Sequence, residues 1–179
     1  MDKIQVRDRE FTISIPEAKI LQRVSEVARQ IQHDLKDEHP LFISVLNGSF
    51  VFAADLLRAV DMPCEVTFVR VASYEGMGST GKVKQLMGLK ENIEGRTVVV
   101  VEDIIDSGLT MKQMLETLRQ QGPKDIRIAS LLVKPGNLKV DLDIDYCCFK
   151  IPNDFIVGYG LDYDGEGRNL RNIYTVVEE

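Results

Sequence analysis

Three carboxylates stand at one junction of this 179-residue chain, in the stretch VVVVEDIIDSGLTM at residues 98–111. Glu102 and Asp103 directly follow four valines, and Asp106 precedes a Ser-Gly pair. Carboxylates can hydrogen-bond sugar hydroxyls, help to hold a hydrated Mg²⁺ or move a proton. Because the valine run predicts a buried strand, these acids would lie where that strand ends.

The residues that follow the third acid suit a phosphate group. A helix predicted after Gly108 would begin with backbone N–H groups that have no acceptor within the helix, beside the hydroxyls of Ser107 and Thr110. Gly108 would let a ligand approach the backbone closely. We therefore predict a site for a phosphorylated sugar, with the ribose over the acids. The simpler alternative is a helix cap with solvated acids, but two acids after a valine run, plus a third, exceed what capping needs.

Strands that alternate with helices would position this junction. The apolar strand segments are residues 11–15, 41–46, 64–74, 97–103, 125–133, 144–151 and 154–162, and the helical stripes are residues 20–35, 52–60 and 111–118. This order predicts an α/β fold with a central parallel sheet flanked by helices, whose ligands bind beyond the carboxyl ends of the strands. Ser14 and Glu17 have the spacing of a capping box for the first helix.

Composition excludes several classes of function. The net charge of −6 and the absence of a Lys/Arg cluster argue against nucleic-acid or anionic-membrane partners. The start has no secretory signal, and no apolar run approaches the roughly 20 residues of a membrane span. The three cysteines form no C-x-x-C pair, which is typical of reduced cysteines in a cytoplasmic protein. The two histidines, both in or just after the first helix, argue against a His-based metal site or a Ser-His-Asp triad.

A glycine-rich stretch offers one rival interpretation. Residues 76–81 read G-x-G-x-x-G after a strand, but a dinucleotide site also needs an immediate helix and an acid about 20 residues on. Gly88 interrupts the segment too early for that helix. A mobile lid that excludes water from a reacting centre fits better. A nucleic-acid-binding regulator of the same fold is the other rival, and it would need a basic face.

The stretch at residues 98–111 resembles the phosphoribosyl-pyrophosphate motif of type I phosphoribosyltransferases, and in particular the hypoxanthine-guanine branch of that family. ASLLVKP at residues 129–135, IPNDFIVGYGLDYDGEGRNLRN at 151–172 and SYEGMGSTGKV at 73–83 also resemble the family's segments. The resemblance covers about residues 41–172. It implies a single domain over residues 1–179, with a core at about 37–150 and a small hood built from about 1–15 and 151–179.

The family activity implied by this resemblance is purine salvage. The enzyme would transfer 5-phosphoribose from phosphoribosyl pyrophosphate to N9 of hypoxanthine and/or guanine, giving IMP or GMP and pyrophosphate. Mg²⁺ would be the cofactor, and the protein would form a homo-oligomer, either a dimer or a tetramer. No nucleic acid and no membrane would be involved.

The resemblance also implies residue roles for the sugar phosphate and the base. Glu102 and Asp103 would bind the ribose hydroxyls, directly or through Mg²⁺-bound water. Asp106 would exchange a proton near N7 of the purine. The residues of the 5′-phosphate turn would be Asp106, Ser107, Gly108, Leu109 and Thr110. The purine would lie between Ile104 and Phe155, with Lys134 at its 6-oxo group and the backbone of Ile156 at its edge.

The pyrophosphate side is implied in the same way. Its loop would be Leu46, Asn47 and Gly48, with Arg168 pairing with pyrophosphate, Asp162 joining Glu102 and Asp103 as metal ligands, and Ser73 and Tyr74 at the tip of the lid. Mammalian members carry lysine where this chain has Asn47 and Leu109. The resemblance therefore implies fewer cationic side-chain contacts to the phosphates here.

Overall fold

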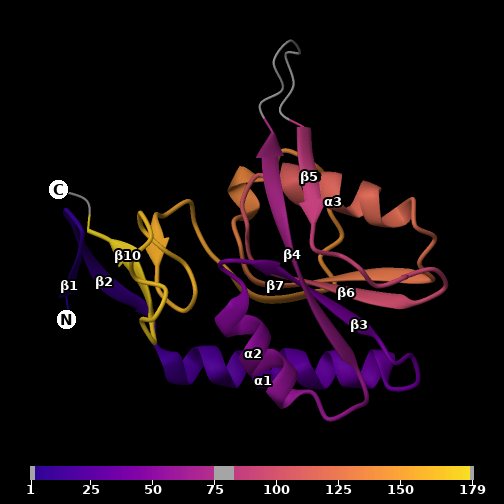
Figure 1. The fold of residues 1–179 in the computed structure, drawn as a ribbon. Helices are drawn as coiled ribbons and strands as arrows, with labels where there is room; N and C mark the ends of the chain where they lie inside the picture. Colours follow the sequence, from indigo (N-terminus) through magenta and orange to yellow (C-terminus); the bar gives the residue numbers. More distant parts are fainter. Residues whose placement is uncertain (1–2, 75–82, 178–179) are drawn as a thin grey trace.

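A computed structural model describes residues 3–74 and 83–177 (Figure 1). Its strands form two separate sheets. The strands of the main sheet are β3 (Leu41–Leu46), β4 (Glu65–Tyr74), β5 (Val83–Met87), β6 (Thr97–Ile105), β7 (Asp125–Val133) and β8 (Tyr146–Lys150). Their spatial order is β5-β4-β3-β6-β7-β8, and all pairs are parallel except β4 with β5. The predicted parallel α/β sheet is confirmed.

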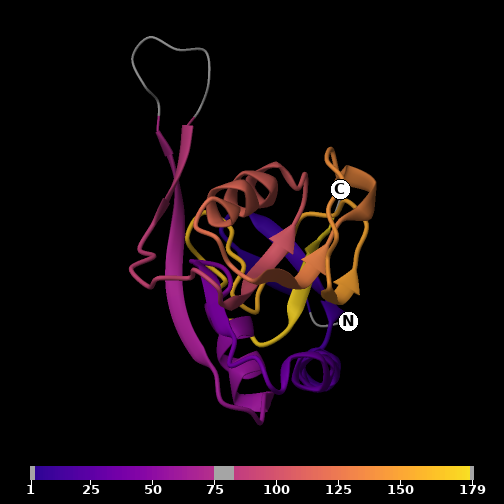
Figure 2. The same cartoon turned by 90° about the vertical axis from the view of Figure 1, so that its right-hand side faces the viewer.

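Helices cover both faces of the main sheet (Figures 1 and 2). They are α1 (Glu17–Leu35), α2 (Phe50–Ala59) and α3 (Leu109–Arg119), and a short 3-10 turn, η1 (Pro135–Asn137), follows β7. The predicted stripe of α1 is confirmed, since Ile20, Val24, Val27, Ala28, Ile31 and Leu35 are all buried. It packs in one core cluster with α2, and α3 packs in a second cluster on the opposite face. Within the described ranges, no helix is long and apolar enough to cross a membrane.

The second sheet is an antiparallel hood at one end of the main sheet (Figure 1). Its order is β1 (Lys3–Val6), β2 (Arg9–Ile15), β10 (Ile173–Val176) and β9 (Ile156–Val157). The sequence pattern predicts β2 but gives neither β1 nor β10. The strand predicted at 154–162 shrinks to β9, because the chain turns at Gly158 and Gly160, whose φ angles are 103° and 101°.

The predicted capping box at the start of α1 is wrong. Ser14 Oγ instead donates to the carbonyl of Ile173 at 3.1 Å. The backbone N–H of Glu17 donates to Asn172 Oδ1 at 2.8 Å, so a distant asparagine satisfies this helix start. The Glu17 side chain pairs with Arg171 at 2.9 Å. The segment leading into β10 therefore fixes the hood against the helix.

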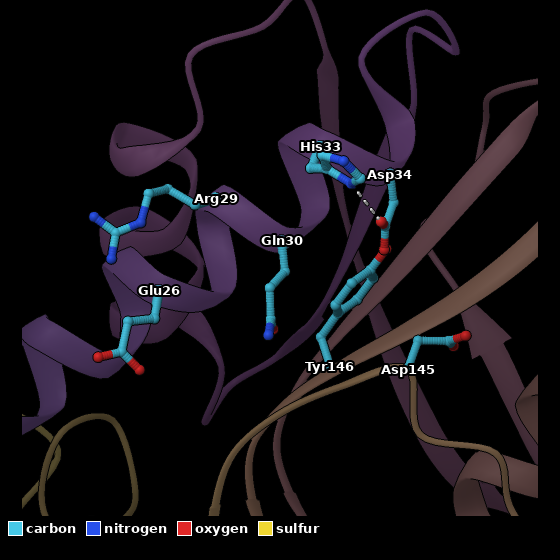
Figure 3. Close-up of a pocket in the computed structure, with 7 residues that line it drawn as sticks. All are labelled: Glu26, Arg29, Gln30, His33, Asp34, Asp145 and Tyr146. Carbon is cyan, nitrogen blue, oxygen red and sulfur yellow. Dashed lines mark hydrogen bonds and ion pairs between the residues drawn. The ribbon is translucent and has the colours of Figure 1, made fainter.

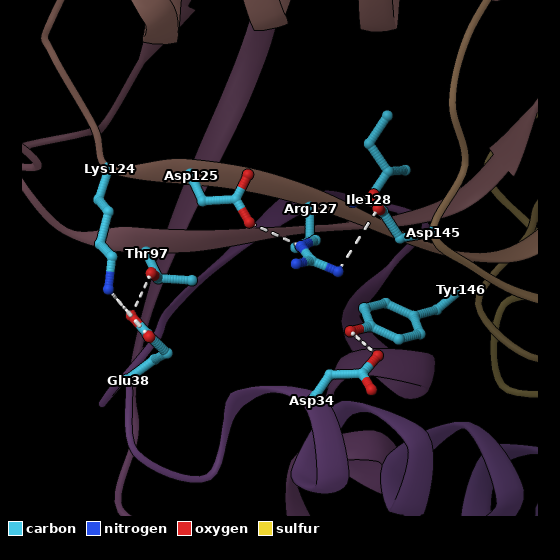
Figure 4. A network of polar contacts seen from close by, with 9 residues as sticks. All are labelled: Asp34, Glu38, Thr97, Lys124, Asp125, Arg127, Ile128, Asp145 and Tyr146. Atoms are coloured by element: carbon cyan, nitrogen blue, oxygen red, sulfur yellow. Dashed lines mark hydrogen bonds and ion pairs between the residues drawn. The ribbon is translucent and has the colours of Figure 1, made fainter.

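A polar network closes the amino ends of the strands (Figure 4). Buried Thr97, at the start of β6, donates to Glu38 at 2.9 Å, and Lys124 reaches the same carboxylate at 2.7 Å. Tyr146, at the start of β8, donates to Asp34 at 2.8 Å. Burial and this hydrogen bond raise the pKa of the Tyr146 hydroxyl, so it stays protonated. These contacts satisfy buried hydroxyls and leave the opposite, carboxyl edge for ligands.

We predict that Asn172→Ala lowers the free energy of unfolding by about 1 kcal/mol, as loss of a helix cap does. Asn172→Asp should restore most of the loss, because a carboxylate oxygen also accepts from the Glu17 N–H. Urea unfolding of the three proteins measures the difference. An equal loss in both variants would contradict the capping role.

Candidate functional site

Two adjacent acids lie at the carboxyl end of β6, as predicted. The backbone N–H of Asp103 donates to Glu102 Oε1 at 3.2 Å, and that of Ile104 donates to Asp103 Oδ1 at 2.8 Å. Burial is the main cause that raises the pKa of Glu102 well above its ordinary value, and the neighbouring Asp103 charge adds to it. Such a carboxylate favours a ligand that brings positive charge or hydrogen-bond donors.

The strand alternation breaks at these acids. Val101 faces the α1–α2 side of the sheet, yet Ile104, three residues later, packs on the same side. On the neighbouring strand, the consecutive Leu131 and Leu132 also face that side. Because Ile104 pairs with Leu132 in register, both strands change phase together. The adjacent acids therefore occupy a local irregularity that an apolar run followed by two acids does not reveal.

Asp106 meets two donors from the segment after β7. Lys134 Nζ lies 3.4 Å from Asp106 Oδ2, and Asn137 Nδ2 donates to Asp106 Oδ1 at 2.7 Å. Lys134 is only 8% exposed, so it is not the surface lysine that the sequence pattern alone would favour. A buried cation, a carboxylate and an amide thus meet at the carboxyl ends of β6 and β7.

The turn between β6 and α3 forms a small cavity. The cavity holds about 120 Å³ and is lined by Glu102, Ile104, Ile105, Asp106, Ser107, Gly108, Thr110 and Met111. Gly108 has a φ of 79°, and a methyl group there would press on Leu142 and Val140. Both the backbone conformation and the packing therefore require glycine at this position. These are reasons for the glycine besides the predicted close approach of a ligand. Leu109 is exposed at the rim.

The loop after β3 packs directly against the acids. A methyl group on Gly48 would overlap the Asp103 carboxylate, and one on Gly160 would overlap the Gly48 carbonyl. The Leu46–Asn47 peptide before this glycine is cis. Glycines at both positions thus let the end of β3, the end of β6 and the loop after β9 come into contact.

Arg70 is a neighbour of this loop that the sequence analysis does not identify. Arg70 Nη2 donates to Asn47 Oδ1 at 2.7 Å, and Arg70 pairs in register with Leu46. A guanidinium therefore lies beside the Asn47 side chain. This contact follows from the parallel register of β3 and β4, which the spacing of residues along the sequence does not reveal.

Asp162 and Arg168 form an ion pair in the loop after β9. Arg168 Nη2 lies 2.8 Å from Asp162 Oδ1, and Arg168 Nη1 donates to the Gly160 carbonyl at 2.8 Å. The other Asp162 oxygen accepts from the backbone N–H of Gly165 at 2.8 Å. Because Gly160 touches Gly48, this pair is adjacent to the loop after β3.

Phe155 presents a flat apolar surface on the hood. Its side chain is 40% exposed, although it contacts the rings of Phe11 and Tyr163 at 6.1 and 5.4 Å between centroids. Arg9 Cζ lies 5.6 Å from the Phe155 centroid, within the range of a cation–π contact. An exposed aromatic ring held by other rings is a suitable platform for a planar base.

The backbone of Ile156 faces the free edge of the hood. The Val176 N–H donates to the Phe155 carbonyl at 2.9 Å, while Ile156 pairs with Thr175. In an antiparallel ladder this makes Ile156 and Thr175 a non-hydrogen-bonded pair. The N–H and C=O of Ile156 therefore point away from β10, and β9 is the outermost strand on that side. These groups can read the edge of a base, as the resemblance implies.

Comparisons with known proteins agree with this geometry. A family model described as "Phosphoribosyl transferase domain" matches residues 16–164. The hypoxanthine phosphoribosyltransferase of Salmonella typhimurium is 44% identical over 168 residues, covering 92% of this chain and 94% of that protein. The hypoxanthine-guanine phosphoribosyltransferase of Aquifex aeolicus is 39% identical over 174 residues, covering 96% and 98%. This chain belongs to the phosphoribosyltransferase family.

Solved structures place it in the hypoxanthine-guanine branch. A hypoxanthine-guanine phosphoribosyltransferase from Bacillus anthracis superposes with a TM-score of 0.86 at 41% identity, over 93% of this chain and 98% of that one. A hypoxanthine phosphoribosyltransferase from Trypanosoma cruzi gives 0.87 at 34% identity, over 96% and 97%. The resemblance and the enzyme class predicted from the sequence are confirmed.

The predicted lid of this phosphoribosyltransferase is described only at its ends. Ser73 and Tyr74 complete β4 and pair in register with Lys84 and Val83 of β5. Residues 75–82 lie outside the described residues, so the lid stays a prediction. The antiparallel pairing of β5 was not foreseen.

A separate cavity of about 490 Å³ lies between α1 and the start of β8, lined by Glu26, Arg29, Gln30, His33, Asp34, Asp145 and Tyr146 (Figure 3). It is at the amino ends of the strands, where Asp34 already accepts from Tyr146 and contacts His33 at 3.2 Å. Its polar groups serve the structure of that edge. The acid-rich carboxyl edge is therefore the candidate active site of the phosphoribosyltransferase.

We predict that Glu102→Gln stabilises the metal-free protein at pH 8 and not at pH 4. Folding raises the pKa of Glu102, so its contribution is full below the ordinary value of 4.5 and is lost as pH rises through the raised value. The glutamine side chain does not ionise. The free energy of unfolding of the variant should therefore increase relative to that of the wild type as pH rises. Urea unfolding at both pH values measures this.

Glu38→Gln is the matched control, because the Lys124 hydrogen bond lowers the pKa of Glu38. That contribution is present above the ordinary pKa and is lost as pH falls, so this variant should be the less stable one at pH 8. Parallel pH dependences for the two variants would contradict the assignment.

Proposed function

We propose that this enzyme joins C1 of 5-phosphoribose, taken from phosphoribosyl pyrophosphate, to N9 of hypoxanthine and/or guanine. The carrying observation is that Lys134 and Asp106 lie 3.4 Å apart at the carboxyl ends of β7 and β6, beside the start of α3. A buried donor for an oxo group, a proton acceptor and a phosphate-binding turn are thus contiguous. The relatives named above act on hypoxanthine or on hypoxanthine and guanine.

The sugar phosphate would lie over the end of β6 and the start of α3. The 5′-phosphate would accept from backbone N–H groups and hydroxyls of the turn from Ser107 to Thr110, where the helix dipole also favours an anion. Glu102 and Asp103 would accept from the ribose hydroxyls, which are donors. This division suits the charges, because carboxylates do not bind a phosphate.

One hydrogen-bond donor and one stacked aromatic ring would hold the base. Lys134 Nζ would donate to the 6-oxo group, and Phe155 would stack on the purine, with Ile104 on the opposite face. As N9 bonds to C1 and the bond from C1 to pyrophosphate breaks, the base must lose a proton from N7. Asp106 is the carboxylate beside Lys134, and it would accept that proton.

Arg168 would stabilise the charge that grows on the departing pyrophosphate, next to the loop of Leu46, Asn47 and Gly48.

The acidic side chains of the site suit a Mg²⁺ ion that arrives with the substrate. Among the described residues no three acids, histidines or cysteines converge, so Glu102, Asp103 and Asp162 do not form one cage. Mg²⁺ commonly uses one or two carboxylates, waters and substrate phosphates. When bound, the ion would neutralise charge on the pyrophosphate.

A cytoplasmic location and a dimeric or tetrameric assembly stay predictions.

Pyrophosphate release with hypoxanthine, guanine, xanthine and adenine tests the function. We expect turnover with hypoxanthine or guanine and none with adenine, because the adenine 6-amino group is a donor and would face the Lys134 donor. Chelation of Mg²⁺ by EDTA should stop turnover, and added Mg²⁺ should restore it. Equal rates with adenine and hypoxanthine, or no rate with any 6-oxopurine, would refute the proposal.

We predict that Asp106→Asn lowers kcat about 10²–10⁴-fold, the usual contribution of a general acid or base. Binding of phosphoribosyl pyrophosphate, measured by calorimetry, should stay within about twofold of the wild type. The substitution leaves the backbone of the 5′-phosphate turn unchanged, and the proposed ribose contacts lie on Glu102 and Asp103. Asp143→Asn, at an exposed aspartate, is the matched control and should be unaffected. Near-normal turnover of Asp106→Asn would remove Asp106 from the mechanism.

A further inference from the structure

Asn137, the last residue of η1, bridges the core and the hood. Its amide Nδ2 donates to Asp106 Oδ1 at 2.7 Å and to Asn153 Oδ1 at 2.6 Å. We infer that Asn137 is a positioning residue, which holds the Asp106 carboxylate and ties it to the segment that carries the purine platform. This inference rests on the proposed function, because it assigns a purpose to the orientation of Asp106.

The chemistry of the two partners fixes the orientation of the Asn137 amide. An ionised carboxylate only accepts hydrogen bonds, so the Asn137 NH₂ group must face Asp106. The two hydrogens of that group match two acceptors, the carboxylate and the Asn153 carbonyl oxygen. Rotation of the amide would place its oxygen against the carboxylate and lose both bonds. Asn137 therefore has one favourable orientation.

Asp106 needs such a partner because its own surroundings do not fix it. Its side chain is 50% exposed at the end of a strand. The Lys134 contact, at 3.4 Å, is long for a charge-assisted hydrogen bond, and it reaches the other oxygen. The short bond from Asn137 is thus the contact that sets the plane of the carboxylate.

Backbone hydrogen bonds hold η1 against the chain on both sides of the catalytic aspartate. The N–H of Lys134 donates to the Ile105 carbonyl at 3.0 Å, and the N–H of Lys139 donates to the Ser107 carbonyl at 2.9 Å. Within the turn, the N–H of Asn137 donates to the Lys134 carbonyl at 3.0 Å. The distance from Asn137 to the aspartate is therefore set by the main chain, which is what a positioning residue requires.

The second bond reaches the hood. Asn153 stands two residues before Phe155, in the segment between β8 and β9. One amide thus connects the carboxylate that takes the purine proton with the segment that bears the stacking ring. A displaced Asp106 would lower kcat, and a displaced Phe155 would raise the KM of the purine. Neither change requires altered binding of phosphoribosyl pyrophosphate.

The experiment begins with Asn137→Ala, assayed with hypoxanthine and saturating phosphoribosyl pyrophosphate. We expect kcat to fall about 10-fold or more, since a hydrogen bond to a charged group is worth about one factor of ten or somewhat over. Calorimetric binding of phosphoribosyl pyrophosphate should be unchanged. Asn92→Ala is the matched control, because Asn92 is an exposed asparagine whose side chain accepts from Glu94 N–H, remote from the site. It should leave kcat unchanged.

A double-mutant cycle with Asp106→Asn separates positioning from general support of the fold. If Asn137 acts through Asp106, Asn137→Ala should slow the wild type but hardly slow the Asp106→Asn variant. The same factor in both backgrounds would overturn the inference, and so would a wild-type kcat in Asn137→Ala. In either case the proposed function would still stand on wild-type turnover and on the Asp106→Asn loss.

Asn153→Ala keeps the inference testable if Asn137→Ala does not fold, because it removes only the acceptor on the hood side. It should raise the KM of hypoxanthine several-fold, lower kcat less than about 10-fold, and leave binding of phosphoribosyl pyrophosphate unchanged. An unaltered KM would overturn the link to the purine platform.

Discussion

The close contact of Asp103 with Gly48 is the constraint on which the rest of the site depends. Any side chain at position 48 would overlap the Asp103 carboxylate, and any at position 160 would overlap the Gly48 carbonyl. Two glycines therefore let three segments meet, with the Asp103 carboxylate against the backbone of Gly48. This contact brings the loop after β3, the acids Glu102 and Asp103, and the ion pair of Asp162 with Arg168 to one edge of the sheet.

Ion pairs limit the free positive charge at this edge of the sheet. Lys134 and Arg168 are each already paired with an aspartate, so neither arm of the site carries a large free charge. Glu102 and Asp103 are adjacent, and burial with mutual repulsion raises the pKa of Glu102. In the proposed reaction, backbone N–H groups, a cation brought with the substrate and Arg168 would meet the charge of the phosphates. The free protein keeps a destabilising carboxylate, which is a common cost of an active site.

Local patterns in the sequence predict the helices and strands whose burial depends on those patterns alone. The stripe of α1 and the valine run of β6 are periodic or continuous, so their burial follows from the residues themselves. The acids at a strand end follow from the parallel sheet rule. Partners across long separations do not follow, since Asn172 caps Glu17 from 155 residues away. The spacing of Ser14 and Glu17 misleads because Ser14 finds a tertiary acceptor in Ile173.

Arg70 and Asn137 are missed for a related reason. Their roles depend on strand register and on a short turn, neither of which has a period that a sequence reveals. The phase change beside Leu132 is hidden because consecutive leucines suit either face of a doubly covered sheet. The family resemblance suggests residues for substrate contact, whereas the residues that hold those side chains, such as Arg70 and Asn137, are seen only in the structure.

Contacts from both ends of the chain set the position of Phe155, the proposed platform for the purine. The cap that Asn172 places on α1 immediately precedes β10, so the helix start fixes where the hood sheet begins. From the other side, Phe11 on β2 supports the ring of Phe155. Segments near both ends of the chain thus position one aromatic ring, and the hydrogen bonds of Asn137 relate the segment before that ring to Asp106. Ile15, Ile156 and Ile173 of the hood pack in the core cluster that also contains α1, whereas Val6, Phe11, Val157 and Tyr174 form a smaller cluster within the hood. Apolar packing therefore holds the hood to the core in addition to these hydrogen bonds.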